Sequence, residues 1–262
     1  MCIRDRGSII TGSGDDVIKL SGGQANLSIY HQQAKDGTWE YSDFYWRNSS
    51  NINAGSGDDI ITLAGTIELE THDYHDWYYS YGDGYGYGYI YGEDGNDTIN
   101  ASNTTAVITL SGGDGDDIIY GAQEYTEQIY GDSGDDTIQF SKGQIAKDRY
   151  SYIDGGDGND TITSSTTLGA ANTYIYGGYG DDIINAGDGN YVIYGDTHAV
   201  RNYRNDDWWW QYYGEPQYLK GGNDTITSGA GNDSIWGGYG DDIINAGDGD
   251  NTVYGGDGND SL

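Results

Sequence analysis

Proline, cysteine and methionine are almost missing from this sequence, because each occurs only once in 262 residues. The only cysteine, Cys2, lies in residues 1–6, which differ from the rest of the chain and are interpreted as an adaptor-derived scar. Without this segment the chain has no cysteine, which excludes a disulfide framework. No apolar run approaches the length that crosses a bilayer, so the sequence predicts no membrane span.

Basic residues are also scarce, with 11 Lys and Arg against 43 Asp and Glu, and the net charge is -32. Such a charge opposes compaction unless counter-ions neutralise it. It argues against nucleic acid and anionic membrane surfaces as partners and favours cations. An acidic, Gly-rich chain is also typical of disorder, but the regular placement of isoleucine described below argues against that interpretation.

The sequence lacks the common motifs of catalytic sites. It contains no GxSxG, HExxH or Cys–His arrangement, and its Gly-rich stretches resemble neither a P-loop nor a dinucleotide fingerprint. Asp pairs such as 181–182 recur along the chain, whereas a catalytic carboxylate pair is a single special constellation. This segment is therefore predicted not to be an enzyme, and a catalytic domain elsewhere in a longer parent protein stays open.

Glycine is abundant, with 45 residues, many of them in short Gly-Asp segments that repeat. Four such segments begin nine residues apart, at 228–233, 237–242, 246–251 and 255–260. Each is followed, after one residue, by a large aliphatic side chain: Ile235, Ile244, Val253 and Leu262. The segment 177–189, GGYGDDIINAGDG, recurs identically at 237–249. These segments follow the nonapeptide GGxGxDxUx, with U aliphatic, and the sequence resembles the RTX (hemolysin-type) calcium-binding repeat family.

The resemblance implies an all-β fold, a parallel β-roll (β-solenoid) of stacked repeats over residues 7–262, with loop inserts on one edge. Upstream, the turns at Gly95, Gly115, Gly134, Gly158 and Gly180 lie 20, 19, 24 and 22 residues apart. Two nonapeptides make 18 residues, which is one coil of a two-sided roll. A spacing slightly above 18 predicts one calcium-type turn per coil and an ordinary loop at the opposite edge. The last residues, 258–262, stop inside a repeat, so the chain is interpreted as a fragment.

The motif suits calcium because Ca²⁺ takes six to eight oxygen ligands at about 2.3–2.6 Å. Glycine permits positive φ, which turns carbonyl groups toward an ion, and the final Asp supplies a carboxylate. The predicted metal ligands on one edge are Asp16, Asp59, Asp97, Asp117, Asp136, Asp160, Asp182, Asp224, Asp242 and Asp260. Asp233 is added from the opposite edge, whose degenerate copies end in Tyr191, Asp233 and Asn251. The predicted carbonyl ligands are those of Gly112, Gly155, Gly177, Gly237 and Gly255.

Stacked strands lie about 4.8 Å apart, so equivalent Asp residues on successive coils can share an ion. The resemblance implies one ion between neighbouring turns, hence at most nine for ten turns. A lone Gly-Asp cluster is more typical of an ordinary β-turn, but the periodicity and the aliphatic position favour calcium here. The two aliphatic side chains buried in each coil form a core that is too thin to offset the conformational entropy lost when the coil is ordered. The metal-free chain is therefore predicted to be disordered and to fold on binding calcium.

Three predicted inserts, 24–53, 66–90 and 196–218, hold six of the seven tryptophans. Their aromatic rings either pack on each other or stack on sugars and partner proteins, so an adhesin or carbohydrate-binding surface is the alternative function. The pair His72 and His75 is a weak candidate for a transition-metal site. Ice binding is disfavoured, because the central position of the turns varies among Ser, Asp, Tyr and Ala. The resemblance implies an extracellular or cell-surface location after type I secretion.

Tyrosine recurs just before the turns, and Trp236 takes the matching place in one copy. The residues concerned are Tyr130, Tyr176, Tyr194, Trp236 and Tyr254. In a roll these rings fall on one face and are predicted to form a stacked ladder. Such a ladder is interpreted as stabilising rather than ligand-binding.

Overall fold

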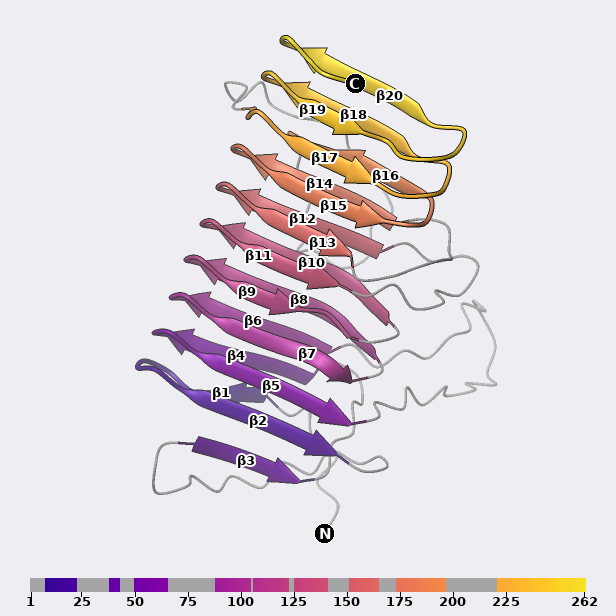
Figure 1. Ribbon diagram of the computed structural model, residues 1–262. Helices are drawn as coiled ribbons and strands as arrows, with labels where there is room; N and C mark the ends of the chain where they lie inside the picture. The colour runs from indigo at the N-terminus through magenta and orange to yellow at the C-terminus, as the bar shows by residue number, and fades with distance from the viewer. Residues whose placement is uncertain are drawn as a thin grey trace, which may run out of the picture.

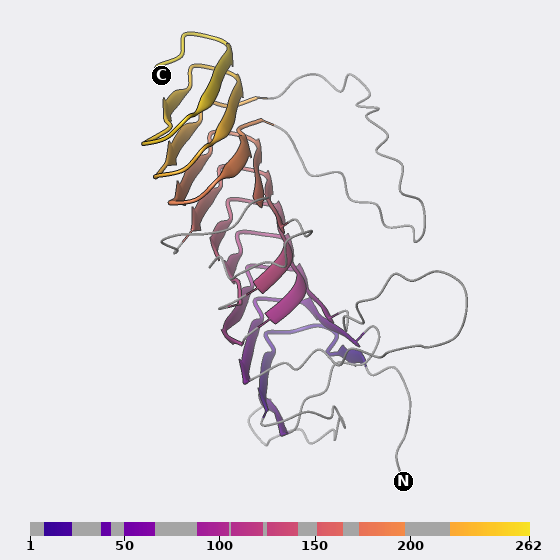
Figure 2. The ribbon, with the colours of Figure 1, turned by 90° about the vertical axis from the view of Figure 1, so that its right-hand side faces the viewer.

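The computed structural model of the protein describes residues 8–22, 38–42, 50–65, 88–104, 106–122, 125–140, 151–164, 173–196 and 221–262. Every regular element in these ranges is a β-strand, and the strands form two parallel ten-stranded sheets (Figure 1). Figure 2 shows the two sheets as the opposite walls of one elongated roll. No helix in the described ranges is long and apolar enough to cross a membrane.

The first sheet contains, in spatial order, β1 (Ser8–Ile10), β4 (Ser50–Ser56), β6 (Gly88–Asp94), β8 (Ala106–Asp114), β10 (Tyr125–Ser133), β12 (Ser151–Asp157), β14 (Thr173–Tyr179), β16 (Tyr191–Tyr194), β18 (Ser234–Tyr239) and β20 (Thr252–Asp257). The second sheet contains, in the same direction, β3 (Thr38–Ser42), β2 (Val17–Gly22), β5 (Ile60–Gly65), β7 (Thr98–Thr104), β9 (Ile118–Tyr120), β11 (Thr137–Phe140), β13 (Thr161–Ser164), β15 (Ile183–Gly187), β17 (Thr225–Ser228) and β19 (Ile243–Asn245).

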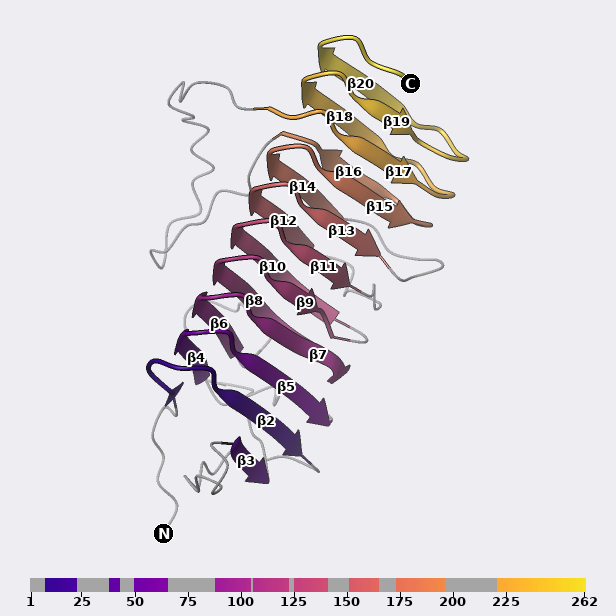
Figure 3. The same ribbon diagram turned by 60° about the vertical axis from the view of Figure 1, so that its left-hand side comes forward.

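The chain alternates between the two sheets, so that successive pairs of strands form successive coils. The turns that lead from the first sheet to the second lie along one side of the roll, which we call the Asp edge (Figure 3). The connections back to the first sheet lie along the other side, the loop edge. β3 is the exception to the alternation, because it follows β2 and pairs with it in the same sheet.

The core is a narrow double column of aliphatic side chains between the sheets. Alternate residues of each strand point inward, and the parallel register places equivalent residues of successive coils directly over one another. The inward residues of the first sheet include Ile52, Ile90, Leu110, Ile129, Ile153, Ile175, Ile193 and Ile235. Those of the second sheet include Ile18, Ile61, Ile99, Ile119, Ile138, Ile162, Ile184, Ile226 and Ile244. The aliphatic U position that follows a turn of the Asp edge therefore supplies the inner row of the second sheet, and the U positions at Ile235 and Val253 lie in the first sheet.

The predicted aromatic ladder is confirmed on the outer face of the first sheet for residues near its C-terminal end. The rings of Tyr176 and Tyr194 stack at 5.3 Å between centroids, Tyr194 and Trp236 at 4.8 Å, and Trp236 and Tyr254 at 5.8 Å. Asp154 occupies the same column between Tyr130 and Tyr176, so the column of rings is interrupted there. The stacked rings cover one another's faces, which leaves chiefly their edges toward solvent.

The predicted all-β roll is confirmed, but one insert differs from the expected placement on a single edge. Residues 66–87 join β5 to β6 on the loop edge, as expected. Residues 197–220 instead join β16 to β17, which places this connection on the Asp edge. Part of the first predicted insert is strand, because it contains β3 and the start of β4. The end of the second predicted insert, residues 88–90, begins β6, and Asp196 of the third is also described. The other residues of the inserts, with His72 and His75, and residues 1–7 lie outside the described residues.

Candidate metal sites along the Asp edge

Each turn of the Asp edge is a six-residue segment whose glycines have distinct roles. In the turn between β12 and β13, Gly155 lies on the inner side and is buried, and Gly156 and Gly158 adopt φ angles of 120° and 141°. These positive angles disfavour any residue with a Cβ atom, so glycine is required at the bend. Asp160 then ends the turn as a buried residue, 1% exposed. The backbone of the repeat thus directs the final carboxylate inward.

The ten aspartates predicted for this edge stand in one column, and nine of them, from Asp59 onward, use one carboxylate oxygen between coils. The backbone N–H of each Asp except the last donates to Oδ1 of its equivalent in the next coil, over distances of 2.6 to 3.1 Å. These bonds run from Asp16 to Asp59 and onward, through the column, to Asp260. Because the acceptor is ionisable, each is a strong type of hydrogen bond.

The other oxygen, Oδ2, is buried without a hydrogen-bond partner in most of this column. The residues concerned among those described are Asp59, Asp97, Asp117, Asp136, Asp182, Asp224 and Asp242. Each of them is 1% exposed. A buried carboxylate oxygen with no donor costs several kcal/mol unless a proton or a cation compensates it. The column therefore contains a series of acceptor atoms that need positive charge.

From the turn at Gly92 onward, backbone carbonyl groups meet these oxygens at the first glycine of the turn, whereas the turn that ends in Asp59 has Ala54 in that place. A Cβ atom placed on Gly131 would collide with Oδ2 of Asp136 and with the carbonyl oxygen of Gly155 in the next coil. The same pair of groups surrounds Gly92, Gly112, Gly155, Gly177, Gly195 and Gly237. The carbonyls predicted as ligands, those of Gly112, Gly155, Gly177, Gly237 and Gly255, all belong to this set.

Two carbonyls of the same kind were missed by the sequence analysis, namely those of Gly131 and Gly195, which face Gly112 and Gly177. Both glycines precede an acidic residue instead of a second glycine. Their signal in the sequence was the aliphatic–aromatic–Gly order that they share with the copies at Gly92, Gly177, Gly237 and Gly255, as in Ile129-Tyr130-Gly131. The first glycine, rather than the full GGxG pattern, marks the carbonyl.

The donor set fits calcium. In the described ranges no three His, Cys, Asp or Glu side chains converge on one point, so a metal here takes one or two carboxylates and completes its shell with carbonyl oxygens or water. All of these are hard oxygen donors, which suit Ca²⁺ and not the thiolate- or imidazole-preferring metals. The absence of a Cβ at the first glycine leaves the space in which carboxylate and carbonyl oxygens approach each other.

Burial raises the pKa of the column carboxylates above the usual value of 3.8. Desolvation is the main cause, the hydrogen bond that Oδ1 accepts opposes it, and repulsion from neighbouring carboxylates adds to the rise in pKa. The pKa of Asp97 rises to about 6, that of Asp136 to about 8 and that of Asp182 to about 9. Without a cation, part of the column therefore holds protons near neutral pH.

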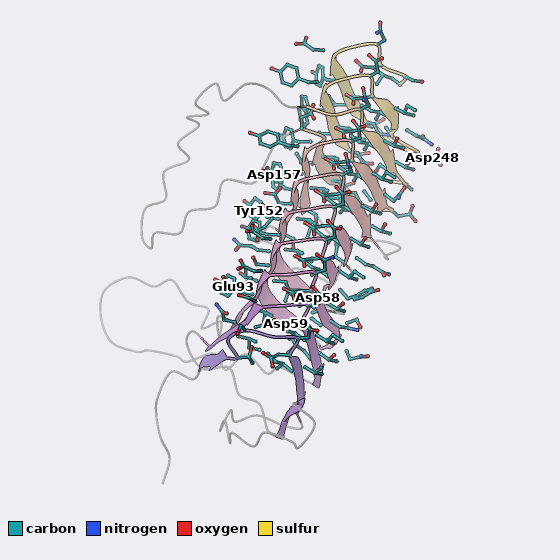
Figure 4. All side chains as sticks on the ribbon, turned by 90° about the vertical axis from the view of Figure 1, so that its left-hand side faces the viewer. Asp58, Asp59, Glu93, Tyr152, Asp157 and Asp248 are labelled. Carbon is teal, nitrogen blue, oxygen red and sulfur yellow. The ribbon has the colours of Figure 1, made fainter. Side chains whose placement is uncertain are left out.

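A second, exposed column lies beside the first and was not predicted. The residue before each final Asp is always Asp or Asn, and its side chain accepts a backbone N–H from the neighbouring coil, as Asp135 Oδ1 does from Asn159 at 2.7 Å. Figure 4 labels Asp58 and Asp59, which represent the two columns at one turn. The members of the exposed column are Asp15, Asp58, Asn96, Asp116, Asp135, Asn159, Asp181, Asn223, Asp241 and Asn259. Both Asn and Asp occur in this column. Its role therefore depends on a side-chain oxygen that accepts a backbone N–H and not on a negative charge.

At the loop edge, the first and final positions of the turns have other residues and other hydrogen bonds than at the Asp edge. Tyr191, Asp233 and Asn251 occupy the final position of successive turns, and Asp233 Oδ1 accepts the N–H of Tyr191 at 2.8 Å. Here, however, Oδ2 of Asp233 accepts a hydrogen bond from the hydroxyl group of Ser228. Ser228 stands where the Asp edge has its first glycine, and Ala186 and Ala246 take that place in the adjacent turns. Asp233 was predicted as a metal ligand. In its turn the side chain of Ser228 takes the place of the first glycine of the Asp edge, and its hydroxyl group donates to Oδ2 of Asp233.

Asp196 explains how the Asp edge admits residues 197–220 without losing its column. Its Oδ1 accepts the N–H of Gly222 at 2.8 Å, and its Oδ2 accepts the N–H of Tyr239. In a regular turn backbone carbonyls take this role, as when Gly158 donates to the carbonyl of Tyr179. The side chain of Asp196 thus replaces the backbone acceptors that the insertion removes, and Asp224 stays in the column.

Comparison with known proteins gives one family. The sequence model of the RTX calcium-binding nonapeptide repeat (4 copies) matches residues 89–103, 109–124, 122–139, 128–143, 150–165, 169–197, 220–253 and 236–262. No curated protein and no solved structure matches the chain. The matched residues cover more than half of the chain and include the turns at which carboxylate and carbonyl oxygens meet. On this evidence the chain belongs to the RTX calcium-binding nonapeptide repeat family.

Proposed function

We propose that this chain is a module that folds when calcium binds along its Asp edge. The observation that supports this proposal is the column of buried Oδ2 atoms without hydrogen-bond partners, which from Asp97 onward lie beside a backbone carbonyl of the next coil. A calcium ion at each such place, held by the Asp edge ligands predicted above, compensates the carboxylate charge. This edge has ten turns, and one ion between each pair of neighbouring turns gives at most nine ions.

The net charge of -32 gives calcium a second effect on stability. In the metal-free chain, folding brings the column carboxylates to within one strand spacing, about 4.8 Å, which adds repulsion to the cost of burial. Each bound Ca²⁺ removes two charges and compensates buried oxygens at the same time. Because the core between the sheets is narrow, binding energy becomes folding energy.

Far-UV circular dichroism tests the proposal directly. The chain in EGTA should give a disordered spectrum at pH 7, and millimolar Ca²⁺ should give a β-spectrum with a midpoint at about 10⁻⁴ to 10⁻³ M. Magnesium at the same concentration serves as the control, because its stricter octahedral shell suits carbonyl-rich sites poorly. A spectrum that is unchanged by calcium would overturn the proposal.

We further infer that the module belongs to a secreted or cell-surface protein exported by a type I system and has no catalytic role of its own. Sites of this affinity stay empty at cytosolic calcium levels and fill outside the cell, so that folding follows export. Expression of the full-length parent protein, followed by measurement of its calcium-dependent protease resistance inside and outside the cell, tests this location. Equal resistance in both compartments would contradict it.

A second candidate function is an adhesin or glycan-binding surface formed by the tryptophan-rich inserts, which is favoured by the six tryptophans that they hold. The ladder on the first sheet is a poor sugar platform, because its rings lie within 9° to 16° of parallel to one another and cover each other's faces. Glycan-array binding that is lost when Trp208, Trp209 and Trp210 are changed to Ala, and kept in Trp236→Phe, would support this function. Absence of any glycan signal would remove it.

A further inference from the structure

The outer face of the second sheet is nearly free of charge on a strongly acidic chain. Its two outward columns run across the strands in register, and from β5 to β19 neither column contains a charged residue. One column consists of Val17, Ile60, Thr98, Ile118, Thr137, Thr161, Ile183, Thr225 and Ile243. The other, from β5 onward, consists of Thr62, Asn100, Tyr120, Gln139, Thr163, Asn185, Thr227 and Asn245. Acidic side chains gather instead at the edges.

The first of these columns carries most of the exposed aliphatic side chains of the described structure. Ile60, Ile118, Ile183 and Ile243 are 45%, 39%, 45% and 57% exposed. Parallel sheets are almost always covered on both faces, and apolar side chains aligned on one surface mark contact sites in soluble proteins. The inner face of this sheet is covered by the first sheet, so the outer face is the one that lacks a cover among the described residues.

The order of residues in this column is symmetrical. From β5 to β19 it reads Ile, Thr, Ile, Thr, Thr, Ile, Thr, Ile, with its centre between Thr137 of β11 and Thr161 of β13. Reversal of the column therefore matches Ile with Ile and Thr with Thr at every step. A two-fold axis imposes this reversal on a surface that meets its own copy.

We propose that two copies of this chain pack face to face through the second sheet, about a two-fold axis that runs parallel to the strands between β11 and β13. In this dimer Ile118 lies opposite Ile183 of the other copy, and Ile60 lies opposite Ile243. The threonines meet each other between these contacts. The uncharged surface favours a second copy over a charged partner, because a second copy presents the same uncharged face with the same strand spacing.

The area of the face favours a weak, reversible dimer. The eight strands from β5 to β19 span roughly 35 Å at about 4.8 Å per strand, and the two columns are about 13 Å wide. The buried area is therefore about 500 Å² per copy, or about 1,000 Å² in total, at the lower limit for a specific interface. A reversible dimer with a dissociation constant in the micromolar range is expected.

The symmetry also links the dimer to calcium, and here the inference rests on the proposed function. An axis parallel to the strands reverses the order of the coils but keeps the strand direction, so both Asp edges come to the same side of the dimer. Their charges repel each other across the interface unless cations neutralise them. Dimerisation therefore requires calcium for charge compensation as well as for folding.

Sedimentation velocity over a range of concentrations in millimolar Ca²⁺ tests the dimer, with circular dichroism of the same samples as a check of folding. The wild-type chain should show a monomer–dimer equilibrium, and the double variant Ile118→Lys, Ile183→Lys should weaken it at least a hundredfold. The matched control, Ser234→Lys with Thr252→Lys, adds the same charge to the outer face of the first sheet and should leave the equilibrium unchanged. A folded chain that is monomeric at every concentration, or equal effects of both variants, would overturn the dimer without affecting the calcium proposal.

Cysteine cross-linking tests the register. In a Cys2→Ser background, Ile118→Cys and Ile183→Cys should form an intermolecular disulfide when the two variants are mixed, and each variant alone should cross-link much more slowly. Thr163→Cys mixed with Ile118→Cys is the control, because Thr163 lies in the other column. Homotypic cross-linking of Ile118→Cys that is as fast as the mixed reaction would exclude this axis, and open-ended oligomers would exclude a two-fold contact.

Discussion

At the scale of the residue, each aspartate of the main column divides its carboxylate between two roles. Oδ1 accepts a backbone N–H from the adjacent coil and thereby joins the stack, as Asp160 Oδ1 does for Asp136 at 2.8 Å. Oδ2 faces the first glycine and a carbonyl, where a cation is needed. A substitution by Asn preserves most of the first role and removes the charge required for the second, so the two roles can be separated.

Asp136→Asn should lower the calcium affinity of the Asp edge by at least about tenfold, which corresponds to about 1.4 kcal/mol. The physical reason is the loss of a buried carboxylate charge beside the carbonyl of Gly155. A calcium titration followed by circular dichroism measures the change. The matched control is Asp135→Asn, which removes the same charge one residue earlier, at an exposed position where other coils already have Asn. Equal losses in both variants would show that overall charge, and not the buried site, determines affinity.

Gly131→Ala should destabilise the calcium-loaded fold by about 1–3 kcal/mol, the usual cost of forcing a methyl group into a filled space. Its Cβ collides with Oδ2 of Asp136 and the carbonyl of Gly155, the two groups that approach each other there. Chemical denaturation in calcium measures the loss. Ala186→Gly, at the equivalent place on the loop edge, is the control and should not change calcium affinity. If Gly131→Ala binds calcium as the wild type does, the ion does not use this space.

At the scale of the element, the two edges stabilise the same coil by different means. From Gly92 onward the Asp edge keeps glycine at the first position, and its Oδ2 atoms are available to a cation, whereas the loop edge has Ala186, Ser228 or Ala246 at that position. Ser228 donates to Asp233, and Asn251 donates from Nδ2 to the carbonyl of Ala246 at 2.8 Å. On the loop edge, protein donors thus satisfy acceptors of the turn.

The turn at Asp196 shows that an element can be interrupted if one side chain restores its hydrogen bonds. Asp196→Ala should destabilise the fold by about 3 kcal/mol or more, because two N–H groups, those of Gly222 and Tyr239, lose a charged acceptor. Hydrogen exchange of those amides, compared with the amides of Gly134 and Gly158 in uninterrupted turns, measures the local effect. Protection that falls equally in all four amides would mean that Asp196 acts on the whole roll and not on this turn.

At the scale of the whole molecule, the raised pKa values predict how the metal-free chain responds to pH. In the fold the carboxylates bind protons more tightly than in the unfolded chain, where their pKa is near 3.8, with values of about 7 for Asp117 and about 9 for Asp182. The folded state thus holds more protons than the unfolded state between about pH 4 and pH 9, so its stability falls as the pH rises through this window. Acid should therefore favour the metal-free fold.

In EGTA, the β-signal should appear as the pH is lowered from 9 toward 4, and calcium binding near pH 7 should release protons. Circular dichroism against pH and calorimetry in buffers of different ionisation enthalpy measure the two effects. Asp182→Asn, which needs no proton to be buried uncharged, should shift the folding midpoint to higher pH. A metal-free chain that is more folded at pH 9 than at pH 4 would contradict the pKa pattern.

The sequence alone determined the repeat and, through it, the fold class, the column of aspartates and most of the carbonyls beside them. This was possible because the nonapeptide is local: glycine sets the bend, Asp follows it, and an aliphatic residue begins the next strand. The Tyr and Trp ladder followed from the same periodicity.

Only the tertiary structure decided which residues of successive coils pair where inserts interrupt the regular spacing of the repeat. It placed residues 197–220 on the Asp edge, assigned Asp196 to the interrupted turn and paired Asp233 with Ser228. It also aligned the isoleucines and threonines of the second sheet into one symmetrical column. The physical reason is that the contacts between coils join residues 18 to 43 positions apart, whose register is fixed by hydrogen bonding and side-chain packing and not by any local pattern.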